Sequence, residues 1–348
     1  MYSTGPKQLE TSIEDNGLPA STGSRADLLD LVKNSSITMG DIRNLNLAGF
    51  HSIESVAHST RAALCKIKGI SESKAIELLR ATTTRCKMGF VSALDVMISR
   101  EDIVQITTGS RAVDSILDGG IEAGCLTELF GESRTGKTQL CSTLAVTCQL
   151  PIEKGGGGGK CIYIDTENSF RPERLIEIAK RFGISEKQVL ANVLVAKCHN
   201  TDHQLSLIKE AARIMSDGGF SLIVIDSITH LYRSEYTGRE ELALRQQHLA
   251  HCLRTLHDLT NVYNIACVLT NQMVDIVNQS QGSSFSRMKS APVGGNIIAH
   301  ASTNRLYLKR LGENLRKCRV YESPYLPDRE GSFVIGSEGI VDTAESGT

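Results

Sequence analysis

Residues 131–138 have the types and the spacing that hold a phosphate. They read Gly-Glu-Ser-Arg-Thr-Gly-Lys-Thr and match the pattern G-x-x-x-x-G-K-[ST] in full. Glycine lets the backbone wrap closely around a phosphate, with its N–H groups pointing inward. Lys137 can reach the β- and γ-phosphate oxygens of a nucleotide, and the Thr138 hydroxyl is a ligand for Mg²⁺. The residues expected to bind ATP here are Gly131, Glu132, Ser133, Arg134, Thr135, Gly136, Lys137, Thr138 and Gln139.

Carboxylates follow two other apolar segments. Leu222–Asp226 ends in an aspartate that fits the acidic group positioning Mg²⁺, although a strand-ending aspartate also often caps the next element. Cys161–Asp165 is followed by Glu167. ATP hydrolysis needs a group that polarises the attacking water, and Glu167 is the better candidate, with Asp165 as a structural cap. A further segment, Ala266–Thr270, runs into Asn271-Gln272, whose amides suit contact with a γ-phosphate.

These side chains need a sheet whose strands end at one edge. The strand candidates are Leu126–Phe130, Cys161–Asp165, Leu222–Asp226 and Ala266–Thr270. Helical stretches separate them, including an amphipathic one after the phosphate loop, and this alternation implies right-handed crossovers. Because a strand precedes the loop and a helix follows it, a simple glycine-rich turn with a solvated lysine is disfavoured. The sequence predicts an α/β core with a mainly parallel sheet over 100–348, with Gly155–Gly159 as a flexible surface loop.

Three shorter regions precede this core. Residues 1–24 are rich in Ser, Thr, Gly and Pro and predict a disordered tail. Residues 25–83 predict a small all-helical domain, in which Ile67–Ser71 resembles the turn of a helix-hairpin-helix. Its glycine permits a tight turn and the next helix can offer N–H groups to a phosphate, whereas a plain turn with a C-cap glycine is the alternative. Residues 84–99 predict a linker with one apolar island.

Composition excludes several classes of protein. The 348 residues suffice for about two domains, and 41% apolar with 22% charged residues is ordinary for a globular protein. No apolar run is long enough to span a membrane, and no secretory signal is evident. Ten scattered cysteines without a C-x-x-C pair argue against a zinc site and a disulfide scaffold, and favour a reducing compartment. With a net charge of −1, any DNA site must be a local basic surface.

Five segments together resemble the eukaryotic recombinases of the RecA/RadA family. They are Phe130-GESRTGKTQ-Leu140, Tyr163-IDTENSFRPER-Leu175, Leu222-IVIDSITHLYR-Ser234, Thr270-NQ-Met273 and Gly294-GNIIAHAS-Thr303, and the likeness runs from about residue 25 to 345. It implies a RecA-type P-loop ATPase core behind a helix-hairpin-helix domain. It also implies a nuclear protein that forms a helical filament on single-stranded DNA and pairs it with double-stranded DNA in recombination and repair. The strings QLPIEKGGG and NTDHQ resemble the mitotic recombinase more than its meiosis-specific sister, whereas Glu167-Asn168 resembles the meiotic and archaeal forms.

The resemblance also assigns roles around ATP, which it places between adjacent subunits. Lys137, Thr138 and Asp226 carry over as phosphate and Mg²⁺ residues, Glu167 as the catalytic glutamate, and Gln272 as the γ-phosphate sensor. The remaining roles are His300 near that sensor, stacking of Arg174 on the adenine, and capping of the neighbour's ATP by Pro327.

Self-assembly and DNA binding are likewise implied. Phe90-Val91-Ser92-Ala93 matches the family's F-x-x-A polymerisation motif, in which Phe90 and Ala93 would add a strand to a neighbour's sheet edge and which mediator proteins mimic. On spacing alone, Phe90 folding onto its own core is the alternative. Residues 232–239 resemble the first DNA loop, and 273–293 the second. The DNA contacts expected are Arg239 and Arg245 on phosphates, Gly294 and Gly295 through N–H groups, and Val277 as a wedge between bases; for the arginines the alternative is solvated charge or an internal salt bridge.

Some positions depart from the family pattern. Glu240 replaces a glycine beside Arg239, and its negative charge opposes phosphate binding. Ser133 replaces an aromatic residue in the phosphate loop, and Arg287 and Lys289 replace paired lysines before Pro292. A non-catalytic paralogue that caps another protein's filament is therefore the main competing interpretation. A ring helicase with the same core is disfavoured by the N-terminal helical domain.

Overall fold

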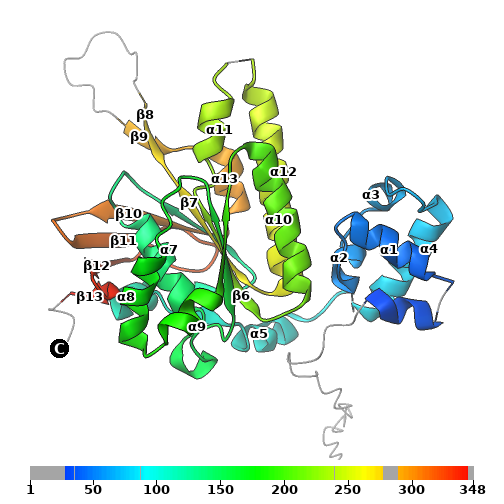
Figure 1. The fold of residues 1–348 in the computed structure, drawn as a ribbon, viewed down its shortest axis with the longest axis horizontal. Coiled ribbons are helices and arrows are strands. Elements are labelled where there is room, and N and C mark those ends of the chain that lie inside the picture. The colour runs from blue at the N-terminus through cyan, green and yellow to red at the C-terminus, as the bar shows by residue number, and fades with distance from the viewer. Residues whose placement is uncertain (1–27, 35, 87, 239, 277–288, 344–348) are drawn as a thin grey trace, which may run out of the picture.

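The computed structural model describes residues 28–343, apart from 35, 87, 239 and 277–288. The tail predicted over 1–24 lies outside this part of the chain. The described residues form a small helical domain and a larger α/β core (Figure 1). None of the described helices is long and apolar enough to cross a membrane.

The helical domain packs around its own apolar core. Its elements are η1 (Leu28–Asn34), α1 (Met39–Leu47), α2 (Ile53–Ala57), α3 (Arg61–Cys65) and α4 (Glu72–Arg85). Leu45, Val56, Leu64 and Leu78 are fully buried in one cluster. Gly69 has a φ of 89° and turns the chain between α3 and α4, where Ser71 caps α4 by accepting from the N–H of Lys74. The segment Ile67–Ser71 thus forms a turn between two helices, and its role as a helix-hairpin-helix that binds DNA stays a prediction.

The region predicted as a linker contains part of two helices. α4 runs to Arg85, and α5 (Ala93–Glu101) begins after Ser92, which forms a capping box with Asp95. None of the residues of α5 is buried. The helix therefore owes its local form to its cap rather than to packing.

The core is built on a nine-stranded sheet in the order β13-β12-β11-β10-β3-β7-β6-β4-β5. Its strands are β3 (Leu126–Phe130), β4 (Lys160–Asp165), β5 (Val193–Lys197), β6 (Phe220–Asp226), β7 (Ala266–Asn271), β10 (Asn304–Arg310), β11 (Leu315–Glu322), β12 (Glu330–Gly336) and β13 (Gly339–Asp342). From β5 to β10 every pairing is parallel, and beyond β10 every pairing is antiparallel. All four strands predicted from the sequence are present. Two shorter ribbons join β1 (Gln105–Ile106) to β2 (Ile121–Glu122) and β8 (Met273–Ile276) to β9 (Lys289–Pro292).

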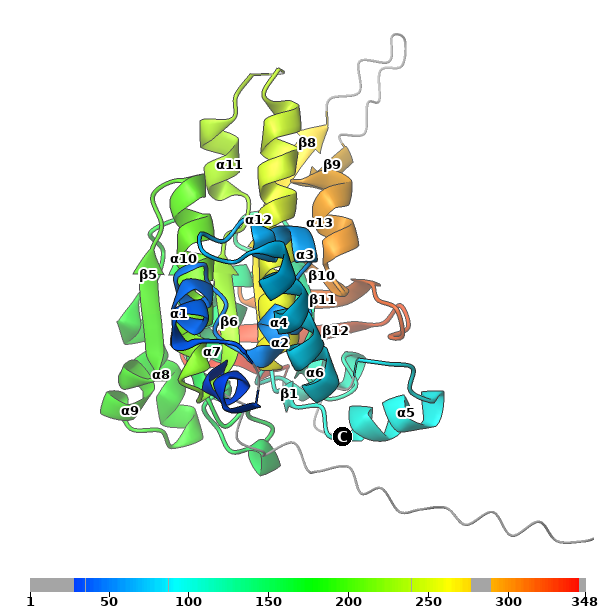
Figure 2. The same ribbon diagram turned by 90° about the vertical axis from the view of Figure 1, so that its right-hand side faces the viewer.

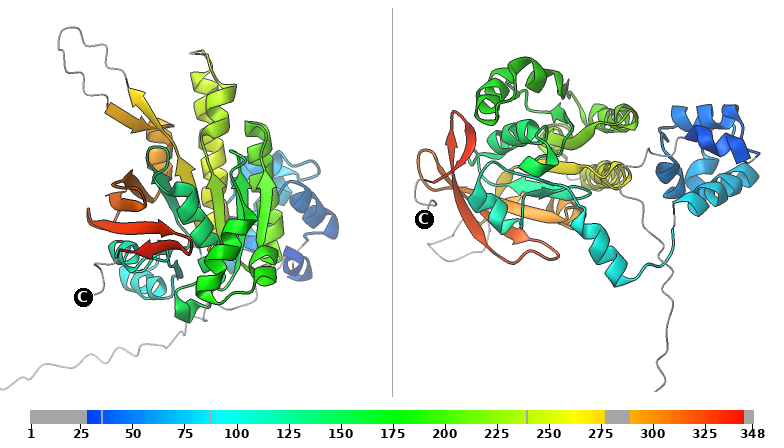
Figure 3. Two further views of the ribbon diagram at one scale, coloured as in Figure 1. Left: turned by 60° about the vertical axis from the view of Figure 1, so that its left-hand side comes forward. Right: turned by 90° about the horizontal axis from the view of Figure 1, so that it is seen from below.

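Helices cover both faces of the sheet (Figures 2 and 3). One apolar cluster joins the sheet to α6 (Arg111–Ile116), α7 (Lys137–Thr147), α8 (Pro172–Phe182) and α9 (Glu186–Ala191). A second joins the other face to α10 (Thr201–Ser216), α11 (His230–Glu235), α12 (Leu242–Tyr263) and α13 (Gly295–Ala301). α7 is buried at every position from Leu140 to Thr147, so the expected amphipathic pattern is wrong for this helix. The sheet covers it on one side and other helices on the rest.

The glycine run is not the flexible loop that the sequence predicts. After η2 (Ile152–Lys154), the N–H of Gly157 donates to the carbonyl of Cys148 and that of Gly158 to Leu150. Gly156 is buried, and a Cβ there would lie 2.0 Å from the Leu150 carbonyl oxygen. Glycine is required here because two backbone segments touch, which leaves no room for a side chain.

Candidate nucleotide-binding and nucleic-acid-binding sites

The phosphate loop has the backbone geometry that its sequence predicts. It leaves β3 at Phe130 and enters α7 at Lys137. Gly136, with a φ of 103°, precedes the first turn of α7, and a Cβ on Gly131 would lie 2.3 Å from the Leu308 carbonyl oxygen. Both glycines are therefore needed, one for its conformation and one for its close packing. The loop opens into a cavity of about 450 Å³ that Glu167, Asp226 and Gln272 also line.

Lys137 lies folded over this loop. Its Nζ donates to the carbonyl oxygens of Gly131 at 2.8 Å and Glu132 at 2.9 Å. Burial lowers the pKa of Lys137, and the carboxylates of Asp226 and Glu167 partly offset that effect. The ammonium group thus already lies inside the cavity, held by weak neutral acceptors that phosphate oxygens would replace.

Asp226 is buried directly behind the start of α7. It accepts hydrogen bonds from the Tyr163 hydroxyl at 2.8 Å and from the Thr270 hydroxyl. Burial raises the pKa of Asp226, and the hydroxyl groups of Thr270, Tyr163 and Thr138 act in the opposite direction. Among the described residues no cluster of three His, Cys, Asp or Glu could hold a metal alone. The oxygens of Thr138 and Asp226 nevertheless fit Mg²⁺, which takes few protein ligands and completes its shell with phosphate and water.

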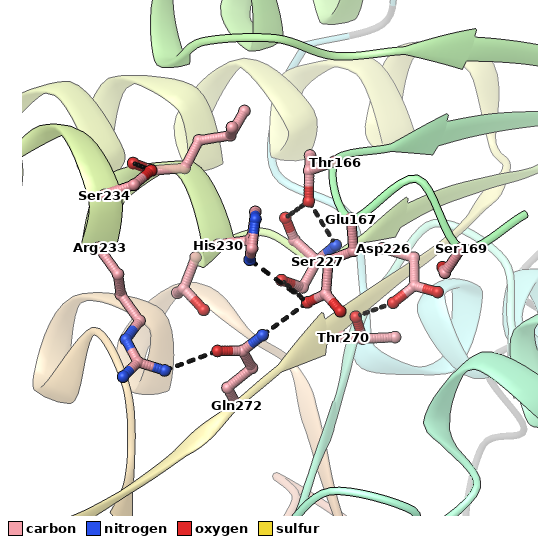
Figure 4. A network of polar contacts seen from close by, with 12 residues as sticks. Thr166, Glu167, Ser169, Asp226, Ser227, His230, Arg233, Ser234, Thr270 and Gln272 are labelled. Atoms are coloured by element: carbon pink, nitrogen blue, oxygen red, sulfur yellow. Dashed lines mark hydrogen bonds and ion pairs between the residues drawn. The ribbon is translucent and has the colours of Figure 1, made fainter.

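Glu167 lies at the centre of a polar network at the edge of the sheet (Figure 4). Its Oε1 accepts from Gln272 Nε2 at 2.6 Å and from the Ser227 hydroxyl at 2.8 Å, while His230 Nδ1 lies 3.9 Å away. Gln272 Oε1 in turn accepts from Arg233 at 2.7 Å. The structure thus brings the expected catalytic glutamate and sensor into contact. It adds Ser227, His230 and Arg233. The sequence signal for Ser227 and His230 was their position after the strand that ends at Asp226, and Arg233 lies in the segment that resembles the first DNA loop.

Asp165 has a structural role in this arrangement. Its carboxylate accepts from the N–H groups of Glu167 at 3.1 Å, Ser169 at 3.2 Å and Phe170 at 3.0 Å. All of its described partners are backbone donors of the turn that follows β4. This turn carries Glu167, which lines the cavity. By holding the backbone of the turn, Asp165 positions the glutamate.

The residues expected around the adenine and the γ-phosphate are dispersed. Arg174 lies near the start of α7, where its Nε donates to Gln139 at 2.7 Å and its NH1 contacts Glu177 at 2.9 Å. His300 lines a separate cavity between α12 and α13, away from the phosphate loop. Pro327 is exposed on the segment that follows β11. The roles of these residues at a subunit interface stay predictions.

The described elements that flank the two segments expected to bind DNA lie at the same end of the core (Figure 1). The first follows α11 and enters α12, where Arg245 is half-buried in the first turn, and the second leaves β8 and returns through β9. Gly294 and Gly295 start α13 with φ values of 87° and 54°. Arg239 and Val277 lie outside the described residues. Glu240 is exposed, which is compatible with the expected opposition to phosphate.

The segment expected to act as a polymerisation motif is exposed to solvent. Phe90 has 111% relative exposure, so it does not fold onto its own core. Ala93 is the first residue of α5 and is also exposed. An aromatic ring with no cover in the subunit is available for a partner.

Comparison with known proteins agrees with this picture. A family model described as Rad51 matches residues 99–343. The chain is 49% identical over 317 residues to the DNA repair protein rhp51 of Schizosaccharomyces pombe, covering 91% of this chain and 86% of that protein. It is 47% identical over 309 residues to the DNA repair protein RAD51 of Mycosarcoma maydis, covering 89% and 91%. The corresponding protein of Saccharomyces cerevisiae is 49% identical over 311 residues, covering 89% and 77%.

Proposed function

The chain belongs to the Rad51 family, whose members act as recombinases in DNA repair, and on that premise we propose that it is a DNA-stimulated ATPase. In this proposal the protein assembles with ATP on single-stranded DNA and exchanges that strand with a homologous duplex. The observation that carries the proposal is the contact between Glu167 and Gln272 beside the phosphate loop.

Hydrolysis needs a water in line with the γ-phosphorus and an acceptor for its proton. Glu167 and Asp226 both line the cavity, and Glu167, the more exposed of the two, accepts the proton as the water attacks. Lys137 stabilises the charge that develops on the phosphate oxygens, and the bond to the ADP oxygen breaks. When bound, Mg²⁺ neutralises charge on the β- and γ-phosphates, and Thr138 and Asp226 would hold it.

Coupling to DNA follows from what Gln272 touches. Gln272 directly precedes β8, which leads into the second DNA segment, and it binds Arg233 of α11, which leads into the first. Contact of this amide with a γ-phosphate therefore acts on both segments. Loss of the γ-phosphate after hydrolysis ends this contact with the Gln272 amide. The two segments then lose a common support, so the affinity of the filament for DNA depends on the bound nucleotide.

Self-assembly in this proposal uses two parts of the subunit, the segment that carries Phe90 and the strand β5. β5 is an edge strand whose Leu194 and Val195 are 39% and 41% exposed. An extended segment carrying Phe90 can add to such an edge, with its backbone supplying hydrogen bonds and its ring an apolar anchor. Mediator proteins that carry the same short motif would compete for this edge, and the site of action would be the nucleus.

The test is ATP turnover with and without single-stranded DNA, in the parent chain and in Glu167→Gln. We expect DNA to stimulate the parent, and Glu167→Gln to lose turnover by about 10²–10⁴-fold while it still binds DNA with ATP. A parent that ignores DNA would favour the competing filament-capping paralogue. In that case Glu240→Gly, which removes the extra charge, is the variant that should restore stimulation.

A further inference from the structure

A continuous chain of polar side chains, buried except at its outer end, crosses the sheet beside the nucleotide site. The Thr229 hydroxyl donates to Asn271 Oδ1 at 2.9 Å, and Asn271 Nδ2 donates to Glu128 Oε1 at 2.7 Å. Glu128 Oε2 accepts from Arg305 Nε at 2.6 Å, and Arg305 NH1 donates to Glu322 Oε2 at 2.9 Å. The chain therefore runs from the end of β7 through β3 and β10 to β11.

Its charged members are placed where charge is costly. Glu128 is completely buried and Arg305 is 5% exposed. Burial alone would lower the pKa of Arg305, but the two carboxylates reverse this and raise it. The guanidinium also lies over the rings of Phe130 and Tyr321, with 5.2 and 5.5 Å to their centroids. A buried ion pair such as Glu128–Arg305 does little for stability compared with apolar packing. The presence of this series of hydrogen-bonded side chains therefore calls for a further explanation.

The inner end of this polar chain adjoins two residues of the nucleotide site, Gln272 and His230. Asn271 precedes Gln272, and its Nδ2 also donates to the Val293 carbonyl oxygen at 2.8 Å, where the second DNA segment ends. Thr229 precedes His230, which lies beside Glu167. Both hydrogens and the oxygen of the Asn271 amide are thus engaged. A shift of this strand end cannot occur without breaking one of those bonds and leaving a buried group unsatisfied.

The outer end of the chain starts the segment that carries Pro327. Tyr321 packs edge-on against Phe130 with 5.1 Å between ring centroids, and Glu322 is the last residue of β11. The family resemblance predicts that Pro327 in this segment caps the ATP of the adjacent subunit. The two ends of the chain therefore face two different nucleotides.

We propose that Thr229, Asn271, Glu128, Arg305 and Glu322 form a relay that couples the γ-phosphate at one site to the cap over the next nucleotide in the filament. The inference rests on the proposed function. These are positioning residues, because they act through Gln272 and Pro327 and touch no substrate. Packed networks of this kind have discrete arrangements, so a small displacement at one end is passed on rather than absorbed.

Two exposed carboxylates provide a matched pair for the test. Glu322 and Glu330 are 57% and 54% exposed, and they pair with Arg305 at 2.9 Å and Lys317 at 2.6 Å. Only Glu322 belongs to the relay. Glu322→Gln and Glu330→Gln each remove one exposed charge, so both variants should have melting temperatures close to that of the parent. A difference between them in hydrogen exchange or in ATP cooperativity then reports on the relay.

The first measurement is amide hydrogen exchange with a non-hydrolysable ATP analogue or ADP, in full-length chains that also carry Phe90→Glu to prevent assembly. Without a neighbour, residues 321–328 cannot contact a nucleotide directly. With the analogue we expect hydrogen exchange of residues 321–328 to slow about threefold or more in the Phe90→Glu chain. The same slowing is expected when Glu330→Gln is added to that chain. No slowing is expected when Glu322→Gln is added instead. Equal slowing in both variants, or none in either despite protection of residues 131–138, overturns the relay.

The second measurement is the ATP dependence of DNA-stimulated turnover in the assembling protein. The relay predicts that Glu322→Gln lowers the Hill coefficient toward about 1 while Glu330→Gln keeps the parent's value. An unchanged coefficient in Glu322→Gln contradicts the relay. Failure of the proposed function has a different signature: the analogue would not protect residues 131–138, or DNA would not stimulate the parent.

Discussion

The amide nitrogen of Gln272 lies 2.6 Å from Oε1 of Glu167. Because the amide oxygen of the same side chain accepts from Arg233, the orientation of the amide is fixed between a carboxylate and a guanidinium. With the Ser227 hydroxyl also bound, two donors occupy the same oxygen of Glu167. A γ-phosphate that attracts the Gln272 nitrogen would free the carboxylate at the moment it is needed.

Arg233 should transmit DNA binding to this switch. Arg233→Gln removes the charged donor to Gln272, and a hydrogen bond to a charged group is worth about 1.5–3 kcal/mol. We expect the stimulation of ATP turnover by single-stranded DNA to fall about tenfold or more. Arg171→Gln is the control, since Arg171 donates to the carbonyl of Phe170 outside the network. Equal stimulation in Arg233→Gln and the parent would exclude this link.

The two carboxylates after β4 should separate stability from catalysis. Asp165→Asn weakens three backbone hydrogen bonds at a buried position, so the free energy of unfolding should fall by about 1–3 kcal/mol. Glu167→Gln should leave stability within about 0.5 kcal/mol, because this side chain is partly exposed. Urea unfolding of the two variants beside the parent measures both. A larger loss of stability in Glu167→Gln than in Asp165→Asn would reverse the assignment.

The site was predictable where a residue ends a strand or follows it closely. The phosphate loop, Glu167 and Gln272 follow strands whose apolar pattern is visible, and Asp226 ends such a strand. The edge of the sheet that brings them together could therefore be inferred. The contact between Glu128 and Arg305 was not predictable. It joins residues 177 positions apart and depends on β10 pairing in parallel with β3, which no local pattern encodes.

The glycine run shows the opposite limit of a sequence pattern. Consecutive glycines are typical of a flexible loop, but here they let the chain pass against the carbonyls of Cys148 and Leu150. Gly156→Ala should therefore lower the free energy of unfolding by about 1–3 kcal/mol. Gly89→Ala is the control, since a Cβ there meets nothing within 4 Å. Thermal unfolding of both variants measures this. If Gly156→Ala left the stability unchanged, the interpretation of the glycine run as a flexible loop would stand.

Asp41 should make the helical domain sensitive to acid. It accepts from the N–H of Thr38 at 2.8 Å and pairs with Lys74 at 2.7 Å. Burial opposes the charge, but these partners prevail and lower the pKa of Asp41 below that in the unfolded chain. Its contribution is then complete above pH ~4 and is lost as the pH falls through the lower folded-state pKa.

The variant Asp41→Asn isolates that contribution. At pH 7 it should reduce the stability of the domain by about 1–2 kcal/mol, since it removes an ion pair and half of a capping box. At pH 2 the parent carboxyl is increasingly protonated, so the difference should shrink. Hydrogen exchange of α1 at the two pH values measures it. A difference that grows on acidification would show that the folded-state pKa is raised instead.

Tyr325 should join the linker helix to the segment that carries Pro327. Its hydroxyl donates to Glu122 at 2.5 Å, and Arg100 near the end of α5 both pairs with Glu122 at 3.1 Å and lies over the Tyr325 ring. Phe90 lies just before the same helix. The two elements expected to contact a neighbour are thus fastened together within one subunit, which lowers the entropy lost when both dock.

Tyr325→Phe removes one hydrogen bond of this fastening and keeps the ring. We expect the protein concentration needed to coat labelled single-stranded DNA, followed by fluorescence anisotropy, to rise about threefold to tenfold, in line with a loss of about 1 kcal/mol. Tyr263→Phe is the control, because the Tyr263 hydroxyl donates to the carbonyl oxygen of Ala212 at 2.8 Å, between α10 and α12 and away from the linker helix. If both variants coat DNA like the parent while melting normally, the linker helix and the Pro327 segment dock independently.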